Sequence, residues 1–316
     1  MRPKKVAVIT GGLGFIGSRL AWRVSRQYKK LVIIDNLHTG SKWRPIPENA
    51  EVLYGRAGDM IWDVEEAEVV FHLGMPSSSP MYKERPQLVG DVVHEMINIL
   101  EWARDRKARV VLASTSSLYN YNPTPWREDM PTRVADYYTE ARYYCERLCE
   151  LYSKLHGVKC VALRLFSVFG EGEQYKGRYA NVITQMIWAA LAKKPFTIYD
   201  DGYQSRDLIY VGDVAEAFAR AAEIPLERFE VVNVGSGCAY TFLDMMRMLA
   251  DYGLYVRARF VPNPIKNYVY YTLADTRKMR KMLGLKPRPV RDVLPQVIEY
   301  YKELWERGEL NVPEDL

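Results

Sequence analysis

Tyr138 and Arg142 lie four residues apart in a tyrosine-rich segment, residues 134–152. Four residues are about one helical turn, so a helix would place the phenol and the guanidinium on the same face. A cation at that distance can lower the pKa of a phenol from about 10 toward neutral pH, and the phenol could then accept a proton. An ordinary i,i+4 pair on a partly exposed helix has the same spacing, so these two residues alone do not decide between catalysis and packing.

A second group of residues is suited to binding phosphate. Gly11, Gly14 and Gly17 follow the β-rich run VAVIT and precede a helical pattern. Glycines at this spacing allow a tight turn, close approach of the backbone to a pyrophosphate, and a helix N-terminus that faces the phosphates. Asp35 ends the next apolar run, where a carboxylate binds both ribose hydroxyls and repels a 2′-phosphate. A glycine-rich turn with a capping Asp would share some of these features, but the full order favours NAD binding.

The elements that must position these groups alternate between strands and helices. Short β-rich runs are VAVIT, LVIID, EVLYG, VVFHLG, RVVLAS and VKCVALRLF, and helical patterns cover residues 14–28, 87–106 and 138–156. This alternation predicts an α/β fold, a Rossmann-type doubly wound parallel sheet. Later helices are expected near residues 179–193, 241–252, 276–283 and 291–306, with strands at FTIY, RDLIYV and VVNVGSG. Asp213, before VAEAFARAAE, is expected to cap a helix.

The change of pattern after residue 167 predicts two interleaved parts. We expect an NAD-binding Rossmann domain over residues 1–167, with a returning segment at about 207–235. A smaller α/β substrate-binding lobe would then comprise residues 168–206 and 236–316.

Composition excludes several other classes of protein. The net charge of +5 is dispersed, without a block of like charges that would indicate nucleic-acid binding. No apolar run approaches the roughly 20 residues that span a bilayer. MRPKK leads directly into VAVIT without the apolar core of a signal peptide, so we expect a cytoplasmic protein. The four cysteines form no C-x-x-C pair and the four histidines are scattered, so no metal site is expected.

The chain resembles the extended short-chain dehydrogenase/reductase family in the order of its motifs, which are TGGLGFIG, DNLHTG, GDM, FHLGM, STSSLY, Y-x-x-x-R, LRLFSVFGEG, DGYQSRDLIYVGDVAEA and VNVGSG. It is most similar to the NAD-dependent nucleotide-sugar epimerases of the UDP-glucose 4-epimerase type. The resemblance implies that a tyrosine removes a sugar hydroxyl proton while the adjacent carbon gives hydride to NAD. The 4-keto sugar then turns and takes hydride back on its other face. A nucleotide-sugar substrate and a homodimer formed through residues 87–106 and 138–156 are also implied.

The resemblance assigns roles to particular residues. Glu146, eight residues after Tyr138, selects Tyr138 as the base, and Arg142 takes the place of the family's lysine. Thr115 is expected to bind the reacting sugar oxygen. The cofactor-binding residues implied are Gly11, Gly14, Phe15, Ile16, Gly17, Asp35, Asn36, Gly40, Asp59, Met60, Leu73, Gly74, Met75, Ser114, Tyr138, Arg142 and Phe166. The substrate-binding residues implied are Ser79, Thr115, Ser167, Asn181, Val182, Arg206 and Lys266.

Three of these assignments have simpler readings. Arg206 matches an arginine that binds diphosphate, but it could instead pair with Asp207. Asn181 could serve as a helix cap without binding a ligand, and Ser79 could belong to a plain polar loop. His72 reads as a core histidine and not as a ligand.

Departures from the family pattern leave the reaction open. Val92 stands where the family has an asparagine, Ser167 replaces another, and residues 262–275 lack the usual R-P-G-D segment, with Lys266 as the nearby cation. Epimerisation at C4 of a UDP-hexose is the leading interpretation. A dehydratase or decarboxylase is the alternative, although Ser116 and Ser117 occupy the places of a dehydratase's Asp-Glu pair. A reductase, or a non-catalytic NAD(H) sensor without the usual lysine, also remains open.

Overall fold

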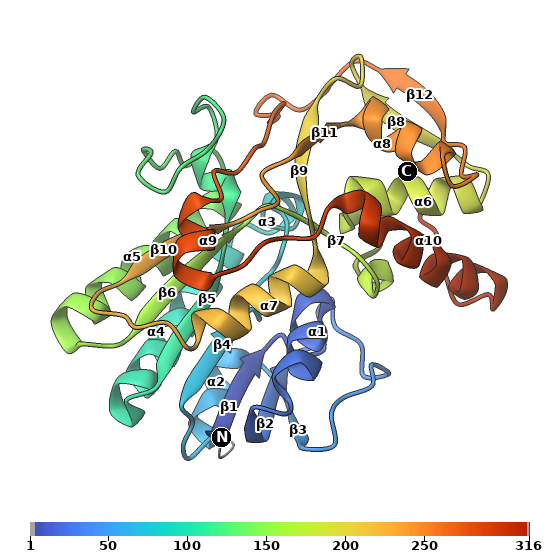
Figure 1. The fold of residues 1–316 in the computed structure, drawn as a ribbon. Coiled ribbons are helices and arrows are strands. Elements are labelled where there is room, and N and C mark those ends of the chain that lie inside the picture. The colour runs from blue at the N-terminus through green and yellow to red at the C-terminus, as the bar shows by residue number, and fades with distance from the viewer. Residues whose placement is uncertain (1–3, 315) are drawn as a thin grey trace.

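The protein is described by a computed structural model that covers residues 4–314 and Leu316. Its centre is a seven-stranded sheet with strand order β10-β6-β5-β4-β1-β2-β3, and every neighbouring pair is parallel (Figure 1). The strands are β1 (Lys4–Thr10), β2 (Tyr28–Asp35), β3 (Ala50–Tyr54), β4 (Val69–His72), β5 (Arg109–Thr115), β6 (Cys160–Leu165) and β10 (Glu230–Val234). The strand order reverses between β1 and β4, which is where doubly wound sheets bind ligands.

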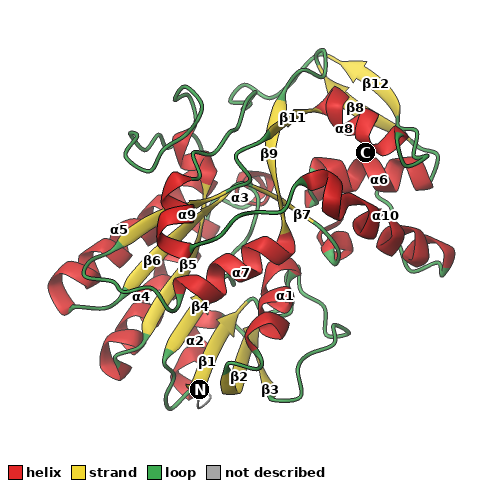
Figure 2. Cartoon of the chain, in the orientation of Figure 1, coloured by secondary structure: helices red, strands yellow, loops and turns green. Residues whose placement is uncertain are grey.

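Helices cover both faces of this sheet (Figure 2). One face carries α1 (Phe15–Val24), α7 (Val211–Ala221) and α9 (Arg277–Leu283), and the other carries α2 (Ala57–Met60), α4 (Leu88–Arg106) and α5 (Tyr137–His156). Alternation along β1 shows why both faces need cover, since Ala7 and Ile9 enter one core cluster and Val8 enters the other. This two-sided burial explains the continuous apolar runs that the sequence shows.

A second lobe packs around its own core and lies beyond the carboxyl ends of the central strands (Figure 1). Its elements are α6 (Val182–Leu191), α8 (Phe242–Ala250), α10 (Val290–Glu306) and the parallel pair β8 (Pro195–Tyr199) and β12 (Arg257–Val261). A separate three-stranded sheet joins β7 (Ser167–Phe169), β9 (Ser205–Tyr210) and β11 (Ala239–Thr241). Short elements complete the chain: α3 (Ser79–Glu84), η1 (Ile61–Asp63), η2 (Ser116–Tyr119) and η3 (Glu173–Tyr179). The division into domains at residue 167 stays a prediction.

The structure confirms the predicted doubly wound sheet and corrects two details. The first helix ends at Val24 instead of extending to residue 28, because β2 already begins at Tyr28. Asp213 does not cap α7, which begins after Tyr210; its carboxylate accepts hydrogen bonds from Arg288 N and Nε, both at 2.8 Å. Over the described residues, no helix combines the length and apolarity needed to cross a membrane, and no three potential metal ligands cluster together.

Candidate active site

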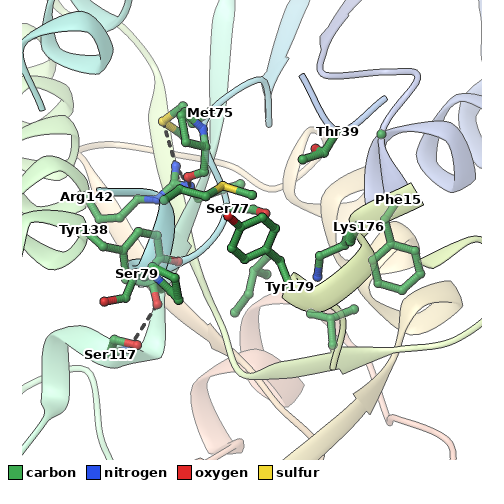
Figure 3. A pocket seen from close by; sticks show the side chains of 18 of the residues that line it. Phe15, Thr39, Met75, Ser77, Ser79, Ser117, Tyr138, Arg142, Lys176 and Tyr179 are labelled. Carbon is green, nitrogen blue, oxygen red and sulfur yellow. Dashed lines mark hydrogen bonds between the residues drawn. The ribbon is translucent and has the colours of Figure 1, made fainter. Parts of the chain in front are cut away.

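A cavity of about 1110 Å³ lies between the central sheet and the second lobe. Its lining includes the turn after β1, the loop after β2, the ends of β4 and β5, the first turns of α5, the segment η3, and residues 265–272 (Figure 3). These segments meet at the switch point of the strand order. The sheet topology therefore brings the predicted cofactor and catalytic residues to one place.

The turn after β1 fits a pyrophosphate. Gly11 has a φ of 67°, and a Cβ built there would lie 2.8 Å from the Cα of Gly74. A Cβ on Gly17 would lie 2.1 Å from the carbonyl oxygen of Gly11, so only glycine allows the helix to start this close to the strand. α1 begins after Gly14, and no side chain among the described residues caps it. Its free N–H groups border the cavity and are suited to bind phosphate oxygens.

Asp35 closes the adenosine side of this turn. Its Oδ2 accepts a hydrogen bond from Leu13 N at 2.9 Å, and its Oδ1 accepts one from Leu37 N at 2.8 Å. Burial raises the pKa of Asp35, and these two backbone N–H groups act in the opposite direction. Gly40 passes so near that a Cβ there would lie 2.7 Å from Oδ1. The carboxylate is thus held rigidly at the end of β2, where a ribose hydroxyl pair fits.

His72 supports the wall formed by the end of β4. Thr10 Oγ1 accepts hydrogen bonds from Leu73 N at 3.1 Å and Gly74 N at 2.9 Å, so its own proton is donated to His72 Nδ1, at 2.8 Å. Burial, with a smaller effect from the nearby Arg142 charge, lowers the pKa of His72 to about 3. His72 is therefore a neutral core residue with its proton on Nε2, in the role the sequence favours.

The buried imidazole predicts a pH effect on stability. Its folded pKa lies below the unfolded value of about 6.5, so the unfolded chain binds one more proton between the two values. Stability from this group is present above pH 6.5 and is lost as pH falls toward 3. His72→Asn keeps an acceptor near the Nδ1 position and cannot titrate. Urea unfolding at pH 6.5, 5.5 and 4.5 should show wild type losing about 2 kcal/mol more than the variant over these two pH units, with the steeper loss below pH 5.5; equal losses would contradict the buried neutral state.

Arg142 is buried beside the ring of Tyr138, with its Cζ 5.2 Å from the ring centroid (Figure 3). Nη1 donates hydrogen bonds to Met75 Sδ at 2.7 Å and to Ala113 O at 3.3 Å, and Nη2 donates to Pro76 O at 2.8 Å. These acceptors come from β5 and from the chain after β4. They fix the guanidinium at the base of the cavity, so Arg142 does not swing into solvent.

The charge of Arg142 is retained in this buried position. Burial lowers the pKa of Arg142, but the neighbouring Tyr138 and Tyr82 hydroxyls act against this effect, and the net direction is upward. Its hydrogen-bond acceptors are all neutral groups. No hydrogen-bonded carboxylate neutralises the Arg142 charge. The guanidinium can therefore stabilise negative charge that forms on the Tyr138 oxygen.

Thr115 ends β5 and borders the same cavity. Its Oγ1 accepts a hydrogen bond from Ser117 N at 3.1 Å, which caps the short helix η2, so the hydroxyl proton stays available. Ser114, one residue earlier, donates to Oε1 of Glu146. Both side chains are buried at the end of a central strand, which limits their movement.

Glu146 forms a buried ion pair with Arg164. Arg164 Nη2 lies 2.6 Å from Glu146 Oε2, and the two side chains are 5% and 4% exposed. Burial lowers the pKa of Arg164, but Glu146 more than reverses this effect, and the value rises above that of an ordinary arginine. The pair ties α5 to β6, while Ser114 ties the same carboxylate to β5. Glu146 thus positions the helix that carries Tyr138.

Four further residues with predicted substrate-binding roles line the cavity. Arg206 donates to the carbonyl oxygens of Ser205 and Tyr270 and contacts the rings of Phe242 and Tyr268, so it does not pair with Asp207. Burial lowers the pKa of Arg206. Asn181 caps α6 through Ile183 N and also lines the cavity, and Ser167 lines it as well. Ser79 donates to the Asp136 carboxylate, so it is more than part of a polar loop.

Most of the predicted site residues line this cavity, and four do not. In the described part of the chain, Asp59 is exposed on α2, Met60 packs against Gly55, Val182 packs on the second core, and Lys266 is exposed. The binding roles of these four stay predictions that the cavity does not support. The roles of the lining residues also stay predictions, but the geometry brings them together.

Sequence reasoning missed the segment η3. Tyr175, Lys176, Arg178 and Tyr179 line the cavity, and Figure 3 shows Lys176 and Tyr179 among the lining side chains. Arg178 and the Tyr179 hydroxyl both donate hydrogen bonds to Glu84 on α3. The signal was present in the glycine-rich run GEGEQYKGR, which places Lys176 and Arg178 five and three residues before Asn181. Both cations of this run line the cavity, whereas Lys266 does not.

A doubly wound sheet with a dinucleotide cradle, a tyrosine–cation pair and a strand-end threonine defines an NAD-dependent short-chain dehydrogenase/reductase of the extended type. The chain belongs to the NAD-dependent epimerase/dehydratase family, which it matches over residues 7–235. The cofactor is accordingly NAD, and the glycine turn and Asp35 fit it.

The relatives of this chain are named for different reactions. The chain is 30% identical over 304 residues to a protein of Methanocaldococcus jannaschii provisionally named a UDP-glucose 4-epimerase, covering 93% of this chain and 98% of that one. It is 27% identical to UDP-glucuronic acid decarboxylase 4 of Arabidopsis thaliana, covering 94% of this chain and 68% of that one. A solved UDP-N-acetylglucosamine 4-epimerase from Methanobrevibacter ruminantium M1 superposes with a TM-score of 0.88 at 28% identity, covering 96% and 99% of the two chains.

Proposed function

We propose that this protein epimerises a UDP-sugar, with UDP-glucose and UDP-galactose interconverted at C4 as the reaction we favour. The observation that carries the proposal is the buried, charged Arg142 beside Tyr138, at the cavity wall next to the dinucleotide cradle. The similarity to UDP-sugar epimerases over almost the whole chain supports the same class.

In this mechanism Tyr138 Oη removes the proton from the sugar hydroxyl and later returns it. Thr115 Oγ1 orients that hydroxyl, because it borders the cavity and its own proton is free to donate. Arg142 stabilises the negative charge on the phenol oxygen. NAD, when bound, supplies the hydride acceptor and donor. NAD would be held by the glycine turn after β1, by Asp35 and by the wall Leu73–Met75.

The arrangement favours an enzyme over a cofactor-binding sensor. Arginine brings a planar group with more donors than lysine, so the swap is not neutral at a tight site. Here Met75, Pro76 and Ala113 provide acceptors for both Nη atoms of the arginine, while its buried Nε has no partner among the described residues. A buried charge with neutral partners is costly. In this chain the charge lies next to the Tyr138 phenol, the group that would act as the base.

Elimination has less support than epimerisation. Ser116 and Ser117 follow Thr115, and neither hydroxyl is a strong acid or base at neutral pH. Decarboxylation shares the oxidation step, and a UDP-glucuronic acid decarboxylase is among the relatives, so it is the alternative that the assay must separate.

The test is incubation of the NAD-supplied protein with UDP-glucose, UDP-galactose, UDP-N-acetylglucosamine and UDP-glucuronic acid, followed by chromatography and mass spectrometry. A product of unchanged mass and altered retention is expected. Loss of CO₂ would indicate a decarboxylase, loss of water a dehydratase, and stoichiometric use of NADH a reductase. NAD-loaded protein that turns over none of the four sugars would overturn the proposal in favour of the sensor.

We also propose a homodimer in a reducing compartment such as the cytoplasm. Tyr137, Tyr144, Leu151 and Leu155 are exposed on α5 at spacings of seven, seven and four residues, which forms an apolar stripe along one face. All four cysteines are free thiols. A monomer mass in sedimentation equilibrium at micromolar concentration would contradict the dimer.

A further inference from the structure

The segment η3 (Glu173–Tyr179) forms a strap across the cavity. It leaves the second lobe through Gly172, whose φ is 92°, and contains a non-helical kink at Gly177. Its far end is bound to α3 on the other side of the cavity, because Arg178 and Tyr179 both contact Glu84. The strap therefore connects the two walls between which cofactor and substrate must lie.

Lys176 is the cation of this strap that lies beside Phe15 (Figure 3). Its Nζ lies 5.5 Å from the centroid of the Phe15 ring, and Phe15 is the first residue of α1. The side chain is 17% exposed, and its residue lines the cavity. Lys176 thus stands beside the helix start that fits the pyrophosphate.

Other cations that line the cavity have different partners. Arg178 binds Glu84, Lys83 contacts Asn267, and Arg206 binds backbone carbonyls of the second lobe. Arg142 is held at the end of β5. Arg56 pairs with Asp91 and Glu95, and Arg85 pairs with Asp91, so both are engaged by α4. Among the cavity-lining cations of the described chain, Lys176 is therefore the one whose contacts reach α1.

Glu173, the ion-pair partner of Lys176, also accepts hydrogen bonds from two other groups. Glu173 is fully buried and accepts hydrogen bonds from Lys176 Nζ at 2.8 Å, Asn181 N at 2.7 Å and Thr184 Oγ1 at 2.7 Å. A shift of Nζ toward a second anion would leave Glu173 with two donors. The lysine can therefore be shared between Glu173 and a ligand.

We propose that Lys176 binds the pyrophosphate of NAD and thereby fixes the strap over the loaded cofactor. A pyrophosphate brings negative charge that the N–H groups of α1 offset only in part, and an ammonium within reach adds a charge-assisted hydrogen bond. Asn181 follows the strap directly and shares Glu173 with Lys176. Cofactor binding would thus also order the substrate side. This inference depends on NAD as cofactor and not on which sugar reacts.

The test measures binding and does not require turnover. NADH affinity of the stripped protein is measured by fluorescence titration, and ADP affinity by competition, for wild type, Lys176→Met and Lys176→Arg. Lys42→Met is the matched control, since Lys42 lies near the cofactor loop but is exposed over the Trp43 ring. UDP affinity of the NAD-loaded protein is measured in parallel.

Lys176→Met should weaken NADH and ADP binding roughly tenfold or more, Lys176→Arg should restore most of it, and Lys42→Met should change it less than twofold. Three outcomes would overturn the proposal. Unchanged NADH and ADP affinity would show that Lys176 does not contact this phosphate. Loss of UDP affinity alone would assign the lysine to the substrate. An equal loss of NADH and ADP affinity in Lys42→Met would show that the effect comes from the overall positive charge of the surface and not from a contact of Lys176.

Discussion

Tyr138→Phe is expected to lower kcat by about 10²- to 10⁴-fold on the sugar that the substrate panel identifies, while NADH affinity stays within twofold. Phenylalanine keeps the ring, so its packing on Tyr82, at a centroid distance of 5.6 Å, and its contact with the Arg142 guanidinium are both retained. Only the proton-transferring oxygen is lost. The measurement is initial-rate kinetics at saturating substrate, together with a fluorescence titration of NADH.

Tyr137→Phe is the matched control for this prediction. Tyr137 is the preceding residue of the same helix, but its side chain is exposed and is not among the residues that line the cavity. It should retain wild-type kcat. Activity that survives in Tyr138→Phe, or that is lost equally in Tyr137→Phe, would show that the proton acceptor has been assigned to the wrong residue.

The spacing of Tyr138 and Arg142 was readable from the sequence, but the environment that makes the arginine useful was not. Its acceptors Met75, Pro76 and Ala113 are 67, 66 and 29 residues away along the chain. The sheet brings them together only because β4 and β5 are neighbours. A helical period predicts which side chains share a face, and says nothing about what that face meets.

The same limit explains the substrate side. The alternation of apolar runs predicted the central sheet because buried parallel strands need apolar residues on both faces. The strap η3 has no such period, so the sequence pattern does not place its cations, and it favours Lys266 only because that residue lies in the segment that departs from the family pattern. Asp213 was misread for a related reason, since its partner Arg288 lies 75 residues away.

Arg164→Met is expected to destabilise the protein by about 3–5 kcal/mol, because it leaves the buried Glu146 carboxylate without its cation. Arg164 and Glu146 lie almost wholly out of solvent, and Arg164 also stacks on Tyr119 at 4.6 Å. The free energy of unfolding in urea at pH 7 measures the loss. Arg147→Met is the control, because Arg147 pairs with Glu150 at 2.7 Å on α5, the helix that also carries Glu146. That pair is half exposed, so its removal should change the free energy of unfolding by no more than about 1 kcal/mol.

The double variant Glu146→Gln/Arg164→Met distinguishes an unpaired charge from a lost packing contact. If the single variant is unstable because a carboxylate is stranded, neutralising Glu146 should recover a large part of the stability, on the order of 1–3 kcal/mol. If instead the loss comes from packing of the arginine stem on Tyr119, the two substitutions should add. Additive losses would also remove the reason to treat Glu146 as the residue that positions α5.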